Sequence, residues 1–105
     1  MKFFTGLAQF LFTLNAYSWD GAVTGKVSKV DVTSAENYGF RIVLEGEPAL
    51  CGNSIKWAYL NSSASNYQTY VSMLLAAKMA QSTVTIYTHQ TGSSKYCSIG
   101  YISVR

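Results

Sequence analysis

The chain has 105 residues, which is enough for one small domain. Hydrophobic residues make up 49% of it and charged residues 12%, and this composition excludes a disordered or low-complexity chain. The net charge of +3 comes from eight basic and five acidic residues, which are scattered without a basic run. Nucleic acid is therefore not expected as a partner.

Residues 1–18 have the pattern of a secretory signal peptide. Lys2 supplies a positive start, an uncharged and largely apolar stretch covers residues 3–14, and the small residues Ala16 and Ser18 precede a cleavage point. The pattern predicts a secreted or periplasmic mature chain, residues 19–105. The alternative is an amphipathic or buried first helix. No membrane span is expected, because the apolar stretch is shorter than the ~20 residues that cross a bilayer.

Cys51 and Cys97 are the two cysteines of the chain. An exported protein matures in an oxidising compartment, so we expect them to form a disulfide. Closing a loop of about 47 residues would add roughly 4 kcal/mol in the chain-entropy model. The alternatives are a metal pair or a reactive thiol. Two cysteines and the single histidine do not complete a closed zinc site, so no metal is expected.

Alternating apolar residues predict three strands in the first half of the mature chain. They cover residues 22–32, 40–45 and 55–60. In the first strand the apolar positions change from odd to even numbers near Ser28 and Lys29, which indicates a β-bulge or a sharp bend.

A helix and two further strands are predicted in the second half. Apolar residues at spacings of three and four predict a helix over 66–80, capped by Ser65 or Asn66. Strands follow around Val84 and Ile86 and over 96–104, with a Gly/Ser-rich loop at 88–95 between them. The helix also carries a weakly charged face, formed by Met73, Ala77 and Ala80. That face either packs against the same helix in neighbouring copies or is simply a small-residue surface.

The predicted order is therefore β-β-β-α-β-β. A bent first strand, five strands and one helix between strands 3 and 4 describe a mainly β protein. The expected fold is a five-stranded, OB-fold-like Greek-key barrel over residues 19–105. An α+β sandwich with a similar order of elements is the alternative.

The chain lacks the residue patterns of known catalytic sites. His89 stands alone where a strand meets a loop, and Glu45 and Glu47 lie at a strand end, where solvated side chains are common. No nucleophile elbow, phosphate-binding glycine loop or metal cluster is present in the sequence. We therefore expect a protein that is not an enzyme and has no cofactor.

Binding is the better-supported function. OB-folds bind oligonucleotides or oligosaccharides, and aromatic and hydroxyl side chains suit a sugar. The aromatic residues either form such a face or fill the core and interfaces; those considered are Tyr38, Phe40, Trp57, Tyr59 and Tyr87.

Two segments of the mature chain resemble the B subunits of pentameric bacterial toxins, of the subtilase-cytotoxin and typhoid-toxin type. One segment is Asp-Gly-Ala-Val-Thr-Gly-Lys-Val at residues 20–27. The other runs from Tyr67 through Leu74 to Val-Thr-Ile-Tyr at 84–87. The chain is also similar to short uncharacterised exported proteins of Gram-negative bacteria, through the Leu-Leu-Ala-Ala-Lys helix and the Cys-Ser-Ile-Gly-Tyr-Ile end.

The resemblance implies a non-catalytic subunit that forms a homopentamer and binds sialylated glycans of a host or cell surface. It implies that Asp20 and Thr24 contact the sugar, with Thr24 standing where the family carries serine. It also implies a catalytic A chain as a partner. The alternative function is an exported structural or inhibitory module that binds protein and has no sugar site.

Overall fold

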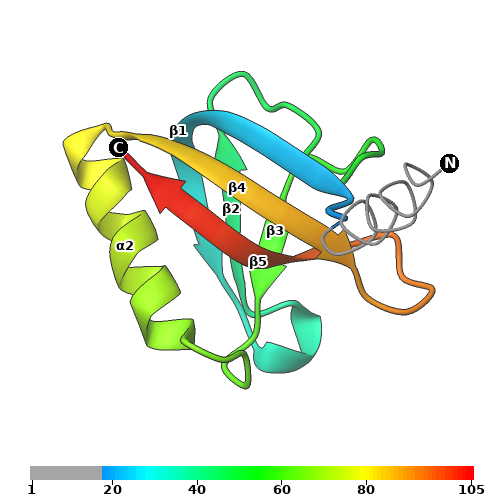
Figure 1. Ribbon diagram of the computed structural model, residues 1–105. Coiled ribbons are helices and arrows are strands. Elements are labelled where there is room, and N and C mark those ends of the chain that lie inside the picture. Colours follow the sequence, from blue (N-terminus) through cyan, green and yellow to red (C-terminus); the bar gives the residue numbers. More distant parts are fainter. Residues whose placement is uncertain (1–17) are drawn as a thin grey trace, which may run out of the picture.

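The computed structural model describes residues 18–105, so the predicted signal peptide falls outside the described part apart from Ser18. The described chain has five strands and one long helix, and Figure 1 shows the helix beside the sheet. The elements are β1 (Gly21–Val32), the 3-10 helix η1 (Ala35–Asn37), β2 (Phe40–Leu44), β3 (Ala58–Leu60), α2 (Tyr67–Ala80), β4 (Thr83–Gln90) and β5 (Cys97–Val104). The predicted mainly β class, with one helix between the third and fourth strands, is confirmed.

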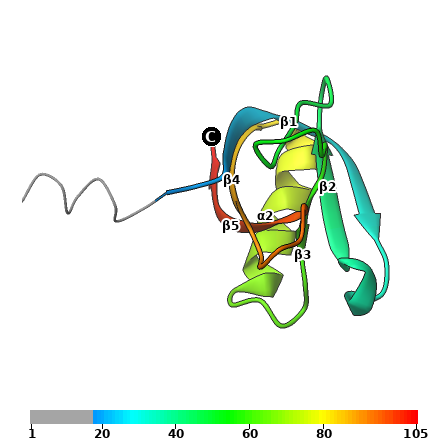
Figure 2. The ribbon, with the colours of Figure 1, turned by 90° about the vertical axis from the view of Figure 1, so that its right-hand side faces the viewer.

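The strands form a closed barrel in the order β1-β2-β3-β5-β4. All neighbouring pairs are antiparallel except β3 and β5, which run parallel and share one ladder pair, Tyr59 with Ser98. Figure 2 shows β4 and β5 on one side of the molecule and β2 on the other. We call the junction between β3 and β5 the seam, because it has the fewest backbone pairs of the five junctions.

The predicted irregularity in the first strand is confirmed. The register of β1 against β2 shifts between Val27 and Lys29. The bulge lets one strand serve two neighbours, since residues 21–26 pair with β4 and residues 27–32 with β2. The bent strand therefore closes the barrel.

The core fills the barrel with aliphatic side chains and one phenylalanine. Helix α2 contributes Leu74 and Ala77, which are almost completely buried. Ala77 thus belongs to the core and not to the exposed face predicted for it. Leu75 and Met79, by contrast, are 41% and 86% exposed, although the helical spacing groups them with the apolar stripe.

Two predicted strand boundaries were wrong, and the cap expected at the start of the helix forms no side-chain hydrogen bond. β3 begins at Ala58 rather than residue 55, because a turn in which the Leu50 N–H donates to the Ile55 carbonyl holds the preceding segment out of the ladder. β4 continues to Gln90, which shortens the following loop. Asn66 is the residue before the helix, but its backbone is left-handed and its side chain makes no capping hydrogen bond.

Candidate functional site

The two residues expected to bind sugar, Asp20 and Thr24, both lie at the surface, at the start of β1 and within it. The Thr24 hydroxyl lies 2.8 Å from the hydroxyl of Thr85, its neighbour on β4. The Asp20 Oδ2 accepts a hydrogen bond of 2.6 Å from the backbone N–H of Gln90 at the end of β4. At the rise of an extended strand the two residues are roughly 13 Å apart, which is longer than one pyranose ring. A ligand that touches both must therefore span more than one sugar unit.

The backbone around Asp20 is held from two sides. On the β4 side, its N–H donates to the Thr88 carbonyl. On the other side the chain passes so close to residues 50–52 that a Cβ at Gly21 would overlap the Leu50 carbonyl oxygen, and one at Gly52 would overlap the Asp20 carbonyl oxygen. The buried hydroxyl of Thr88 donates to the same Leu50 carbonyl at 2.6 Å. Asp20 is thus fixed by backbone contacts, and its Oδ1 has no hydrogen bond among the described residues.

Between Asp20 and Thr24 an aromatic surface covers the outer face of β4 and β5. We call this set the outer patch: Trp19, Tyr87, His89 and Tyr101. Tyr87 and Tyr101 are ladder partners whose rings stack with centroids 4.7 Å apart. The Trp19 ring lies against them and against His89, at centroid distances of 5.8 to 6.4 Å. Tyr101 is 51% exposed and Trp19 36%, so this patch presents aromatic faces to solvent.

A backbone irregularity aims Tyr101 outward. The register between β4 and β5 shifts after Tyr87, so that Gly100 is left without a ladder partner. Simple alternation would place Tyr101 on the same side as Cys97 and Ile99, which are buried. A Cβ at Gly100 would lie 2.6 Å from the Trp19 ring, so the glycine also provides the seat for Trp19.

Sequence reasoning missed most of this patch. It noted Tyr87 as an aromatic candidate and did not assign Trp19 or Tyr101 to a site. The signal that could have found them is the isolated glycine inside the last predicted strand, because such a glycine often marks a bulge or a close approach.

A second aromatic group lies across the seam from the outer patch, around β3 and the start of β5. We call it the β3 cluster: Tyr38, Trp57, Tyr59 and Tyr96. Tyr59 is only 6% exposed, because the rings of Tyr38 and Trp57 cover it at centroid distances of 4.8 and 6.5 Å. The Tyr96 ring stacks in turn on Trp57. The Arg41 guanidinium lies 4.4 Å above the Trp57 ring and donates to the carbonyls of Asn37 and Tyr38.

The predicted disulfide is confirmed. Cys51 and Cys97 are bonded, with their Cα atoms 5.5 Å apart, and both are buried. The bond joins the loop after β2 to the first residue of β5, next to the single β3–β5 ladder pair. It therefore reinforces the seam.

Charged groups contribute little to these surfaces. Two exposed ion pairs, Lys29 with Asp31 and Lys56 with Glu47, have separations of 3.5 and 3.9 Å, and pairs of this kind stabilise a fold weakly. Hydrogen bonds with its own backbone and with Ser34 lower the pKa of Glu36, which lies in η1 and away from both aromatic groups.

The histidine has one polar side-chain neighbour. His89 Nε2 lies 3.4 Å from the Ser98 hydroxyl. A serine–histidine pair needs a third group to orient the imidazole, and no acidic side chain hydrogen-bonds to His89 within residues 18–105. The expectation that the chain is not an enzyme stays a prediction.

Neither a metal site nor a membrane-spanning helix is present within residues 18–105. In residues 18–105, no group of three or more His, Cys, Asp or Glu side chains is placed to hold a metal ion. No helix in the described part of the chain is long and apolar enough to span a bilayer.

Comparison of the chain with protein-family models, with curated proteins and with solved structures finds no match in any of the three. The resemblance to toxin B subunits therefore stays a prediction, as does the finer assignment of the barrel to the OB-fold. What the molecule does has to be argued from its own surfaces.

Proposed function

We propose that the chain is an exported glycan-binding subunit, similar in role to the B subunits of pentameric toxins. The observation that carries the proposal is the outer patch with Asp20 at one end and Thr24 at the other. Exposed aromatic faces pack against the apolar faces of sugar rings, and neighbouring carboxylate and hydroxyl groups bind sugar hydroxyls. The Oδ1 of Asp20, which has no hydrogen-bond partner within residues 18–105, would accept from a sugar hydroxyl, and the Thr24 hydroxyl can both donate and accept.

Assembly into a ring rests on a separate observation on α2. Leu75 and Met79 lie one turn apart on its outward side and are exposed by 41% and 86%. Met73, exposed by 40%, lies on the flank of the helix near Tyr101 and Ile102 of β5, and Lys78 is the basic residue of the last turn. Exposed apolar groups of this kind mark contact surfaces, and several linked copies would raise the avidity of a weak sugar site.

The disulfide supports export. Disulfides persist in oxidising compartments such as the periplasm or the extracellular space, and are rare in the cytosol. The bond between Cys51 and Cys97 therefore agrees with the predicted signal peptide and with a secreted or periplasmic location.

The test has two parts. Native mass spectrometry of the oxidised chain is expected to give a ring of five subunits, and a glycan array is expected to show binding to sialylated glycans. The double variant Asp20→Ala/Thr24→Ala should lose that binding. The matched control Asp31→Ala/Thr33→Ala changes two exposed residues near the other end of β1 and should retain it. Circular dichroism of both variants checks that the barrel is intact.

The exposed side of α2 also favours the second function, a protein-binding module without a sugar site. In that case the chain is expected to be monomeric, to bind no glycan and to retain its protein partner in the Asp20→Ala/Thr24→Ala variant. Substituting Leu75 and Met79 by serine should then abolish partner binding. Glycan binding that depends on Asp20 and Thr24 would exclude this second function.

A further inference from the structure

A pocket opens on the outer surface at the seam, beside the outer patch. It arises because β3 and β5 pair at one point only, after which β3 ends at Leu60 and the loop 61–66 leads away to α2. β5 continues alongside β4. The space left between β5 and the segment formed by β3 and its following loop has a volume of about 380 Å³. We call it the seam pocket. Its size is at the lower end of the range for small-molecule sites.

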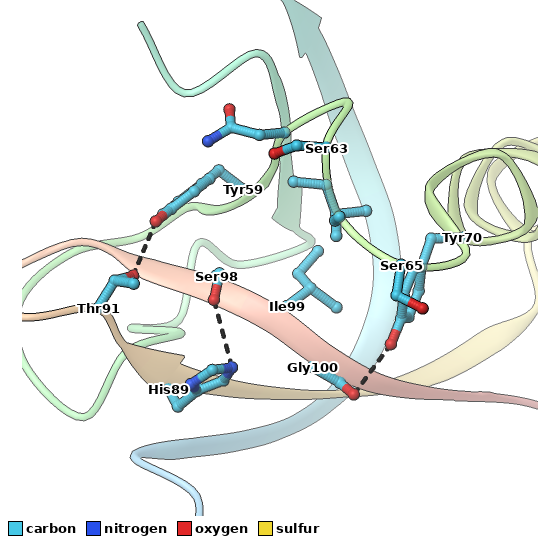
Figure 3. A pocket seen from close by; sticks show the side chains of 12 residues that line it. Tyr59, Ser63, Ser65, Tyr70, His89, Thr91, Ser98, Ile99 and Gly100 are labelled. Carbon is cyan, nitrogen blue, oxygen red and sulfur yellow. Dashed lines mark hydrogen bonds between the residues drawn. The ribbon is translucent and has the colours of Figure 1, made fainter. Parts of the chain in front are cut away.

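The lining of the seam pocket is polar at the rim and apolar at the floor. Figure 3 shows three hydrogen-bonded pairs around Ile99: Tyr59 with Thr91, Ser98 with His89, and Tyr70 with Gly100. The Tyr59 and Thr91 hydroxyls are 2.8 Å apart, and the Tyr70 hydroxyl donates to the Gly100 carbonyl at 2.9 Å. Ser63 and Ser65 add two hydroxyls from the loop above. Hydroxyls that surround an apolar floor match both the polar edge and the apolar face of a pyranose ring.

None of the twelve lining residues is Asp, Glu, Lys or Arg. A sugar with a carboxylate would lose its hydration on entering the pocket and would meet no lysine or arginine there. A neutral sugar would exchange its hydrogen bonds with water for hydrogen bonds with the protein hydroxyls. Asn61 forms part of the wall, and its Oδ1 is buried without a hydrogen-bond partner within the described residues. That oxygen is closed off from the pocket and lies near Gly39, so it offers a ligand no acceptor.

The seam pocket and the outer patch meet at two residues. The His89 ring lies edge-on to Trp19 at 5.8 Å, while its Nε2 faces Ser98 in the pocket. Gly100 seats Trp19 on one side and presents its carbonyl to Tyr70 on the other. The two surfaces are therefore adjacent. A glycan chain could pass from one to the other over His89.

We propose that the seam pocket is a second saccharide subsite, which takes one neutral pyranose unit of the glycan whose neighbouring unit lies on the outer patch. The proposal rests on the proposed function, because it assigns a subsite of the same glycan.

The test follows backbone amide signals of the isotope-labelled protein by nuclear magnetic resonance during titration with neutral methyl glycosides. The panel consists of methyl galactoside, methyl glucoside and methyl N-acetylgalactosaminide at millimolar concentrations. We expect at least one of them to shift the amide signals of Ser63, Thr91 and Ser98. N-acetylneuraminate should leave the Ser63 and Thr91 signals unchanged, because no lysine or arginine lines the pocket. The Ser98 signal is left out of this comparison, since Ser98 contacts His89 of the outer patch.

Two variants localise the effect. Ser65→Trp places a large ring in the pocket from an exposed loop position, and it should weaken the binding of the glycoside about tenfold or more. Ser62→Trp is the matched control, because Ser62 is exposed in the same loop and does not line the pocket. Ser98→Ala removes one hydroxyl without adding bulk, so a misfolded Ser65→Trp variant does not leave the question open.

The outcomes separate the two proposals. If no neutral glycoside shifts the pocket signals while sialylated glycans still bind through Asp20 and Thr24, the seam pocket is not a subsite and the proposed function stands. If Ser65→Trp and Ser98→Ala bind the glycoside as tightly as the wild type does, the subsite is likewise refuted. If no glycan binds on the array and no glycoside shifts any signal, the proposed function itself fails.

Discussion

The outer patch and the β3 cluster contain the same kinds of side chain and use them differently. In the β3 cluster the rings cover one another, so that Tyr59 is 6% exposed, its hydroxyl is bonded to Thr91, and Arg41 caps Trp57. In the outer patch the rings pack side by side, and Tyr101 remains 51% exposed. Aromatic content therefore does not distinguish a binding surface from a structural one. Exposure and unused hydrogen-bonding groups do.

The difference has a local origin in the backbone. Tyr38 adopts a left-handed conformation with φ 60°, which turns its ring onto Tyr59 and completes the β3 cluster. The bulge at Gly100 has the reverse effect, because it turns Tyr101 away from the core. One irregularity covers an aromatic surface and the other exposes one.

The largest effect on stability is expected from removing the disulfide. This bond adjoins the β3 cluster, because Tyr96 directly precedes Cys97. The variant Cys51→Ala/Cys97→Ala should lose roughly 4 kcal/mol of unfolding free energy, because the unfolded chain regains the entropy of an open loop. Urea denaturation measures the loss, and wild-type protein in a reducing agent should show the same drop. A loss below about 1 kcal/mol would mean that the rest of the barrel holds the seam without the bond.

The comparison is tested most directly by making one substitution in both settings. Tyr59→Ala leaves a cavity in the β3 cluster and should cost roughly 3 kcal/mol of unfolding free energy. Tyr101→Ala removes an exposed ring and should cost less than about 0.5 kcal/mol. On a glycan array Tyr101→Ala should bind about tenfold more weakly at unchanged stability. Equal losses of stability would show that the two groups are not different in kind.

A smaller effect is expected from the cation above the β3 cluster. Arg41→Gln should lower the unfolding free energy by about 1 kcal/mol, because it removes the contact with Trp57 and the hydrogen bonds to the Asn37 and Tyr38 carbonyls. Lys95→Gln is the comparison variant, since its ammonium lies 5.6 Å from the Tyr96 ring in an exposed position. Its effect should be smaller by at least half. If the two substitutions lower the unfolding free energy equally, the contact of Arg41 with Trp57 does not stabilise the cluster.

Much of the fold was predictable, because its determinants are local. The change of apolar parity in the first strand predicted the bulge, and the three-to-four spacing predicted the helix. Two cysteines in a chain with a predicted export signal led us to expect the disulfide. These features depend on residues close in sequence or on a simple count.

The site was less predictable, because its determinants lie far apart. The outer patch joins Trp19 to Tyr101, which are 82 positions apart in the sequence, through a register that one bulge resets. The early start expected for β3 failed for a related reason, since strand pairing depends on the partner strand and the preceding turn as well as on alternation. The positions of Asp20 and Thr24 at the surface agree with the role predicted for them, and that role stays a prediction.

The seam has a consequence for the motions of the barrel. Local opening follows the path that breaks the fewest backbone hydrogen bonds, and here that path separates β3 from β5. Oxidation of Cys51 and Cys97 limits how far the two strands part without adding pairs between them. In hydrogen–deuterium exchange, amides of β3 and of the loop that follows it should exchange earlier than those shared by β4 and β5. The junction between β3 and β5 would then be held at one end by the disulfide and would open transiently along the rest of its length.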